Sequence, residues 1–220
     1  MNNRKTLIFD LDGTLLNSID DIEICMNEVL KEFNLKVFEI PEYKYFVGYG
    51  VDILVENVLK AQNREDDKFL REKISKRFKE VYDNVLHKNT KPYDGIIELL
   101  ETLQENSCNL AVLSNKPHNL TVSYVNNSFP NINFLEIHGQ KSDVPKKPDP
   151  FMALEIAKKI NVDPKDIYFI GDTKVDMQTA KSANMTAIGV LWGFRDEKEL
   201  KDFGADYIVN NPLQIIKIIL

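Results

Sequence analysis

The sequence predicts an α/β protein: a parallel sheet with helices on both faces, and an all-helical domain inserted after the first strand. Short apolar runs alternate with amphipathic, helix-length segments after residue 92, which is typical of parallel strands joined by crossover helices. Between the first apolar run and that region, the periodicity is helical throughout. A chain of 220 residues suits one main domain with a smaller insert.

The first strand is predicted at Thr6 to Phe9, and a polar loop follows it directly. Leu7-Ile8-Phe9 is a continuous apolar run, as expected of a parallel strand buried on both faces. The next residues are Asp10-Leu11-Asp12-Gly13-Thr14. The sequence therefore predicts two carboxylates at the carboxyl end of a buried strand.

The helical insert is predicted to span residues 17–87. Apolar residues three or four positions apart indicate helices with one buried face. These helices are expected at about residues 19–33, at 51–60 and within the charged stretch 64–88. The predicted domains are therefore residues 1–16 with 88–220 for the α/β core, and 17–87 for the insert.

The rest of the chain alternates between the two kinds of element. Helices are expected at residues 96–103, 151–160, 175–183 and 213–220, and strands at 110–113, 167–170, 186–190 and 207–209. In a parallel sheet of this kind, ligands lie beyond the carboxyl ends of the strands, where the strand order reverses.

Composition and charge limit the possible partners. The chain has 43% hydrophobic and 28% charged residues, as ordinary globular proteins do, and a formal net charge of -6. Because binding to nucleic-acid backbones requires a basic face, a general nucleic-acid partner is not expected. No apolar run is long enough for a signal peptide or a membrane span, so we expect a cytoplasmic protein without a membrane partner. Cys25 and Cys108 are too few for a disulfide framework or a zinc cluster.

Four polar clusters follow the predicted strands or precede the helices between them. They are Asp10 to Thr14, Ser114-Asn115-Lys116, Lys146-Lys147-Pro148-Asp149-Pro150, and Gly171 to Asp176. Each cluster alone has the composition of an ordinary loop. The first is unusual, because Asp10 and Asp12 repel each other unless a cation or a proton is shared between them.

These clusters resemble the motifs of the haloacid dehalogenase (HAD) superfamily. The matching residues are Asp-Leu-Asp-Gly-Thr-Leu from Asp10, Ser114-Asn115, Lys147-Pro148, and Gly171-Asp172-Thr173 with Asp176 four residues after Asp172. All occur in order, and the resemblance covers nearly the whole chain. It implies a Rossmann-like core with the insert as a mobile cap. The tail, Leu191 to Arg195 and Ala205 to Val209, resembles the phosphoglycolate phosphatase-like branch.

Charge balance independently favours a metal. Four acidic side chains at one edge, together with a phosphate monoester, would not come together without a cation, and Mg²⁺ suits such oxygen ligands. The resemblance implies that Mg²⁺ binds the Asp10 side chain, the Asp12 backbone carbonyl and Asp172. Asp176 would be a supporting or water-mediated ligand.

The resemblance also implies catalytic roles. Asp10 would take the phosphoryl group as a nucleophile, and Asp12 would act as general acid and then general base. Ser114 and Asn115 would hydrogen-bond the phosphoryl oxygens, and Lys147 would balance their charge. Lys146 is the alternative for this lysine.

Several alternatives stay open. The resemblance implies a phosphatase, with 2-phosphoglycolate as the leading substrate. Inorganic pyrophosphate or a sugar phosphate could be the substrate of the same core. A hexose-phosphate mutase, which passes the phosphoryl group to another sugar hydroxyl, is a further alternative. A non-catalytic regulator is disfavoured because every acidic residue that the chemistry needs is present. Dehalogenation is disfavoured because dehalogenases proper lack a carboxylate at the position that Asp12 occupies here. The turn from Gly48 to Gly50 is either a plain turn or a part of the cap that contacts the substrate. Trp192 and Phe194 likewise either pack in a loop over the edge of the sheet or contact the substrate. The protein is expected to be a monomer or a homodimer.

Overall fold

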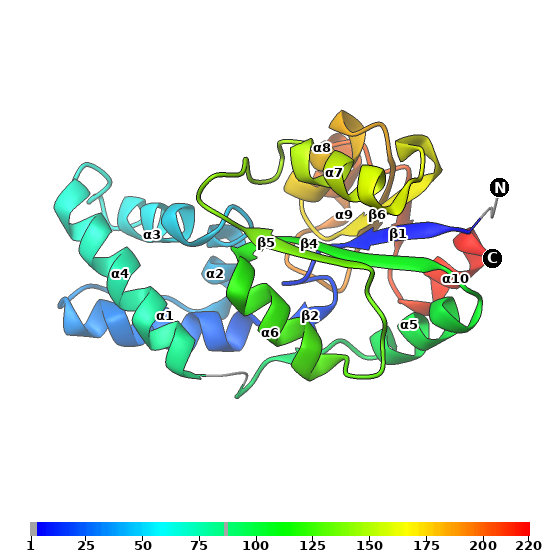
Figure 1. The fold of residues 1–220 in the computed structure, drawn as a ribbon. Coiled ribbons are helices and arrows are strands. Elements are labelled where there is room, and N and C mark those ends of the chain that lie inside the picture. Colours follow the sequence, from blue (N-terminus) through cyan, green and yellow to red (C-terminus); the bar gives the residue numbers. More distant parts are fainter. Residues whose placement is uncertain (1–3, 86–87) are drawn as a thin grey trace. The chain divides into compact units, whose positions relative to one another are not determined.

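The chain folds into two compact units. A computed structural model describes residues 4–85 and 88–220. One unit contains the residues up to 17 together with 92–220, and the other contains residues 18–91 (Figure 1). The predicted end of the insert at residue 87 lies outside the described residues. Asn89 and Thr90 belong to the helical unit because both bond to Asp21, near the start of α1 (Ile19–Glu32).

The larger unit is built on a six-stranded parallel sheet. Its strands are β1 (Thr6–Phe9), β4 (Asn109–Pro117), β5 (Glu136–Gln140), β6 (Ile167–Gly171), β7 (Thr186–Val190) and β8 (Tyr207–Val209). Their order is β5-β4-β1-β6-β7-β8, with β1 between β4 and β6 in parallel register. Because the order reverses around β1, the loop after this strand lies where ligands bind in such sheets.

Helices cover both faces of the sheet, which confirms the predicted fold class (Figure 1). α7 (Phe151–Ile160), α8 (Lys174–Ser182) and α9 (Glu197–Asp202) share a buried core with strand residues such as Ile8, Phe169 and Ala187. On the opposite side lie α5 (Ile96–Glu105), α6 (His118–Ser128) and α10 (Leu213–Ile219). A short 3₁₀ helix, η1, spans Pro164–Asp166.

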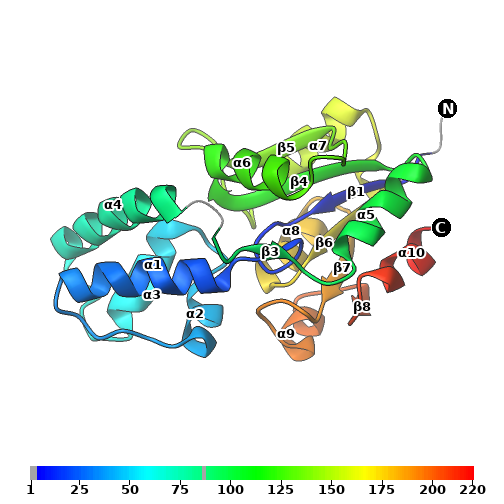
Figure 2. The same cartoon turned by 90° about the horizontal axis from the view of Figure 1, so that it is seen from below.

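The described residues of the helical unit form four helices. They are α1, α2 (Ile40–Phe46), α3 (Val51–Lys60) and α4 (Lys68–Val85). α4 packs against α1 and α3, and α2 packs against the same two helices (Figure 2). Two-residue strands, β2 (Leu16–Asn17) and β3 (Lys91–Pro92), pair where the chain enters and leaves this unit. None of the helices in the described ranges is long and apolar enough to cross a membrane.

Some elements carry too weak a pattern to be predicted. β5 reads Glu-Ile-His-Gly-Gln and pairs only with β4 at the edge of the sheet, so it lacks the apolar run of a central strand. α2 buries one side chain, that of Tyr43, and α6 is rich in polar residues. β4 continues four residues past its predicted end at Leu113, so Ser114, Asn115 and Lys116 lie within a strand.

Candidate functional site

Three acidic side chains from two segments of the chain meet at the carboxyl ends of the central strands. Asp10 follows β1, while Asp172 and Asp176 lie in the loop after β6 and the first turn of α8. All three are buried, and one carboxylate oxygen from each lies within 4.8 Å of the other two. The backbone N–H of Asp10 donates to the carbonyl of Ile170 at 2.9 Å, which aligns the two strand ends.

Lys147 lies among these carboxylates. Its Nζ is 2.8 Å from Oδ1 of Asp10 and 2.6 Å from Oδ1 of Asp176, and its side chain is 3% exposed. The contact with Asp10 is a buried ion pair of hydrogen-bond length. The two oxygens of a carboxylate have about four lone-pair sites, so Asp10 can bind a cation in addition to Lys147.

Burial and mutual repulsion perturb the acidic groups. Burial raises the pKa of Asp10 to about 7, against the opposing effect of Lys147 and with a further increase from Asp176. Burial also raises the pKa of Asp172 well above its usual range, and Asp176 and Asp10 add to this effect. Both shifts mean that the ionised forms of Asp10 and Asp172 destabilise the fold unless a positive charge compensates them.

Local hydrogen bonds fix the two later aspartates. Asp172 accepts from Oγ1 of Thr14 at 3.2 Å and from the backbone N–H of Phe194 at 2.8 Å. Asp176 accepts from the backbone N–H and the hydroxyl of Thr173 at 3.0 and 2.8 Å, which forms a capping box at the start of α8. These bonds set the carboxylate directions before any ligand binds.

Glycines allow the loops to approach the carboxylates closely. A Cβ added to Gly13 or Gly193 would overlap Asp172, and one added to Gly171 would overlap Asp176. Gly13 also has a φ of +90°, which L-residues rarely adopt. Any larger residue at these positions would displace the acidic groups.

The predicted phosphate-binding residues lie on the neighbouring strand, β4. Asn115 bonds the main chain of Lys147 twice: its Oδ1 accepts from the N–H at 2.9 Å, and its Nδ2 donates to the carbonyl at 3.0 Å. The amide therefore orients the main chain of Lys147. Oγ of Ser114 accepts from the backbone N–H of Lys116 at 3.2 Å and keeps its own hydrogen to donate.

Two contacts were not predicted from the sequence. Nζ of Lys116 lies 3.0 and 3.2 Å from the two carboxylate oxygens of Asp12. The indole N–H of Trp192 donates to the carbonyl of Thr14 at 2.9 Å, so Trp192 ties the loop after β7 to the loop after β1. The position of Lys116 beside Ser114-Asn115 was the available signal, but nothing in the sequence indicates that it pairs with Asp12.

The donor set fits a divalent cation. Asp10, Asp172 and Asp176 supply hard carboxylate oxygens close together, and Lys147 balances only part of their charge. Mg²⁺ and Ca²⁺ bind through such ligands, whereas zinc sites usually include histidine or cysteine. The structure therefore provides a candidate metal centre at the end of β1.

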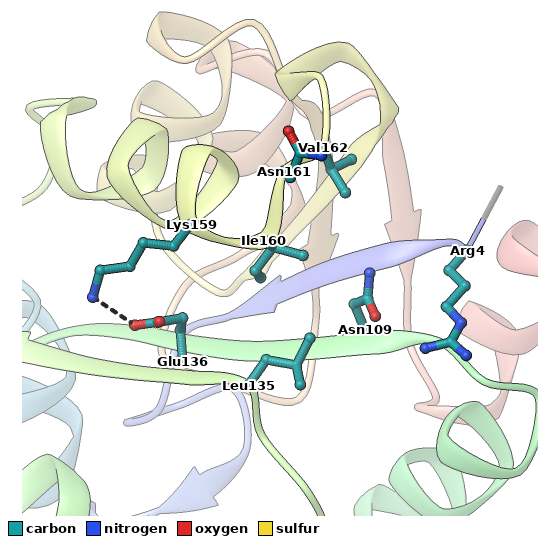
Figure 3. Close-up of a pocket in the computed structure, with 8 residues that line it drawn as sticks. All are labelled: Arg4, Asn109, Leu135, Glu136, Lys159, Ile160, Asn161 and Val162. Atoms are coloured by element: carbon teal, nitrogen blue, oxygen red, sulfur yellow. Dashed lines mark hydrogen bonds and ion pairs between the residues drawn. The ribbon is translucent and has the colours of Figure 1, made fainter. Parts of the chain in front are cut away.

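A hollow of about 850 Å³ lies at the end of the sheet opposite the acidic cluster (Figure 3). It is lined by residues that precede β1, begin β4 and β5, or end α7 and follow it. Within it, Lys159 pairs with Glu136 at 3.1 Å. Because the acidic cluster lies at the carboxyl ends of the strands, this hollow is separate from it.

Comparisons with known proteins agree with this geometry. Residues 7–190 match the haloacid dehalogenase-like hydrolases. The phosphoglycolate phosphatase of Mannheimia succiniciproducens is 31% identical and aligned over 100% of both chains. That of Aquifex aeolicus is also 31% identical, over 97% of this chain and 96% of its own.

Solved structures show the same fold. A predicted phosphoglycolate phosphatase from Haemophilus somnus matches with a TM-score of 0.89 and 28% identity over 99% of both chains. β-Phosphoglucomutase from Clostridium difficile matches with a TM-score of 0.78 but 19% identity, over 96% of this chain and 93% of its own, and therefore shows the fold alone. The chain belongs to the haloacid dehalogenase-like hydrolase family, and within it to the phosphoglycolate phosphatase-like branch of phosphoric monoester hydrolases.

Proposed function

We propose that the protein is a Mg²⁺-dependent phosphatase that hydrolyses a small phosphate monoester, with 2-phosphoglycolate as the leading candidate. Phosphatases of this family use a divalent metal and act on phosphorylated small molecules, and the buried aspartates can bind such an ion. The observation that carries the proposal is a cluster of three buried carboxylates, two of which pair with one buried lysine. The names of the relatives support the choice of substrate.

In the first step, a carboxylate oxygen of Asp10 attacks phosphorus and the bond to the ester oxygen breaks. Asp12 gives its proton to the leaving alkoxide, and the product is an aspartyl phosphate. Lys147 and the hydroxyl of Ser114 hold the phosphoryl oxygens, since both come from segments next to Asp10.

In the second step, Asp12 takes a proton from water, and the water oxygen attacks the phosphorus of the aspartyl phosphate. The bond to Asp10 breaks, which releases inorganic phosphate and restores the carboxylate. Each carboxylate therefore returns to its starting state after one turnover.

Mg²⁺ would be held by the Asp10 side chain, the Asp12 backbone carbonyl and Asp172. When bound, the ion supplies Lewis acidity and orients the phosphoryl group. Asp176 already accepts bonds from Thr173 and pairs with Lys147, which suits a supporting or water-mediated role.

The helical unit, residues 18–91, is proposed to be the cap that selects the substrate. Its insertion directly after the first strand and its content of helices support this role. The turn around Gly48 and Gly50, which both have positive φ, is the candidate for substrate contact within it.

Replacing the nucleophile tests the function. We expect Asp10→Asn to lower phosphate release from 2-phosphoglycolate about a thousandfold or more, because an amide cannot form the aspartyl phosphate. Asp202→Asn, at a surface position where the side chain is 54% exposed, serves as the matched control. Phosphate release should be measured across phosphorylated metabolites that include pyrophosphate and glucose 1-phosphate. An Asp10→Asn variant that keeps a tenth of the wild-type rate would exclude the nucleophile, and isomer formation without phosphate release would favour a mutase.

A further inference from the structure

The two carboxylates of the first loop are paired with different lysines. Asp10 faces Lys147, which also contacts Asp176. Asp12 faces Lys116, whose Nζ is 3.0 Å from one carboxylate oxygen and 3.2 Å from the other. The Lys116 side chain is 4% exposed and that of Asp12 is 20% exposed, so the pair lies at the border of the solvent.

Lys116 is held rigidly by its own strand and by the helix that follows. Its backbone N–H donates to Oγ of Ser114 at 3.2 Å, and its carbonyl accepts from Oγ1 of Thr121 at 3.1 Å. Its ammonium group lies 4.2 Å from the centroid of the buried ring of Tyr124, a favourable cation–π contact. A lysine fixed at both its main chain and its ammonium can impose a direction on the carboxylate that it binds.

That direction matters because of the charges nearby. Asp10, Asp172 and Asp176 form one negative cluster, and Lys147 is already shared between two of them. Without a cation of its own, Asp12 would be repelled by this cluster, or drawn toward a metal bound there. Both carboxylate oxygens of Asp12 instead contact the ammonium group of Lys116, so Asp12 has a counter-ion that it does not share with the cluster.

We propose that Lys116 is a positioning residue that holds the carboxyl group of Asp12 where it exchanges a proton with the leaving group. This role rests on the proposed function, in which Asp12 is the general acid and base. In the first step, the proton moves from Asp12 to the alkoxide oxygen, and Lys116 stabilises the carboxylate that is left. Lys116 keeps its own protons throughout, so it takes part in no bond-breaking step.

The dependence of the rate on the leaving group tests this role. An alkyl phosphate such as 2-phosphoglycolate has a poor leaving group that needs an acid, whereas p-nitrophenyl phosphate has a good one that leaves without it. We expect Lys116→Met to lower the rate of aspartyl phosphate formation, measured in a single turnover, at least about tenfold more for the alkyl ester than for the aryl ester. The second step is the same for both esters, so it is left out of this comparison. A general disturbance of the site would lower both rates by the same factor.

Matched variants complete the experiment. Asp12→Asn should show the same leaving-group dependence, and the double variant should be little worse than Asp12→Asn, because both single changes remove one function. Lys158→Met, at a lysine whose side chain is 79% exposed, is the control for the substitution itself. Circular dichroism should establish that each variant is folded, and Lys116→Gln replaces Lys116→Met if the latter does not fold.

Two results would overturn the positioning role. One is an equal loss of rate on both esters in the Lys116 variant, and the other is a loss in the double variant that equals the product of the two single losses. If Asp12→Asn lowers the rate of aspartyl phosphate formation equally for both esters, the acid role of Asp12 in the proposed function is wrong, and the role of Lys116 is excluded with it. If Asp10→Asn stays fully active, the nucleophile assignment fails by itself, which separates the two failures.

Discussion

At the scale of single residues, the site depends on which of two adjacent lysines is buried. Lys147 lies among Asp10 and Asp176, whereas Lys146 is only partly buried. Burial opposes the charge of Lys147, but the two carboxylates outweigh it and raise the pKa of this lysine above its usual value. Lys147 therefore stays charged and is a counter-ion for the acids. In the proposed function it also binds the phosphoryl oxygens.

We expect Lys147→Met to lower kcat about a hundredfold or more, since a cation next to the transferred group is lost. Without added metal, it should also lower the free energy of unfolding by about 3 kcal/mol, because buried carboxylates lose their partner. Lys146→Met is the matched control and should change both quantities little. Steady-state kinetics and urea denaturation provide the measurements, and a larger kinetic effect at Lys146 would reverse the assignment.

The acidic residues of this site could be predicted from sequence because their positions relative to strand ends determine where they meet. Asp10 and Asp172 follow strands that prove to be neighbours, and Asp176 lies one helical turn later. The pairing of Asp12 with Lys116 could not be predicted, because it depends on how far β4 extends and where its last side chains point. The same limit applies to Trp192, whose indole bonds to a backbone carbonyl.

At the scale of elements, one buried carboxylate joins the start of α1 to the segment that leaves the helical unit. Asp21 is fully buried. It accepts from the backbone N–H and side-chain amide of Asn89, and from the backbone N–H and hydroxyl of Thr90, at 2.6 to 3.2 Å. Bonds of this kind to a charged acceptor are about twice as strong as neutral ones.

Removing that charge should weaken the helical unit. We expect Asp21→Asn to lower the free energy of unfolding by about 2 to 3 kcal/mol, because an amide nitrogen would face donors in place of a carboxylate oxygen. Asp20→Asn is the matched control, since Asp20 lies in the same first turn but is less buried. Chemical denaturation followed by circular dichroism measures both variants. Equal effects would show that the helix dipole, and not this set of bonds, accounts for the loss.

The elements themselves were predictable in proportion to their apolar content. β1, β6 and β7 are central strands with continuous apolar runs, and their positions agree with the predicted ranges. β5 was not predictable, because an edge strand needs fewer apolar side chains and here includes Glu136 and His138. α2 was missed for a related reason: it contributes mainly Tyr43 to the unit's core.

At the scale of the whole molecule, we expect the acidic cluster to make the stability of the fold depend on pH and on a bound divalent cation. The pKa of Asp10 rises from its ordinary value of 3.8 to about 7 on folding, so the folded chain keeps this proton to higher pH than the unfolded chain. In the absence of metal, the stability due to Asp10 is therefore present below about pH 4 and lost as the pH rises toward 7. A bound divalent cation should restore it.

We expect Mg²⁺ to raise the unfolding temperature of the protein at neutral pH. At a hundred times its dissociation constant, a ligand that binds only the folded state adds about 2.7 kcal/mol. Asp172→Asn should abolish this increase, while leaving the metal-free protein at least as stable as the wild type, because one buried negative charge is removed. Differential scanning calorimetry with and without EDTA makes the comparison, and Asp163→Asn, with a half-exposed side chain, is the control. A persistent Mg²⁺ effect in Asp172→Asn would contradict the predicted ligand.

The central position of β1 has a consequence for synthesis on the ribosome. Thr6 pairs with Asn109 on one side and with Ile167 on the other. The edges of β1, which is translated first, are therefore covered only after β4 and β6 have been translated. The helices of residues 18–91 make their contacts within a shorter length of chain and can form earlier. The apolar β1 therefore stays without both of its neighbouring strands until most of the protein has been translated, which makes this strand a candidate for chaperone binding.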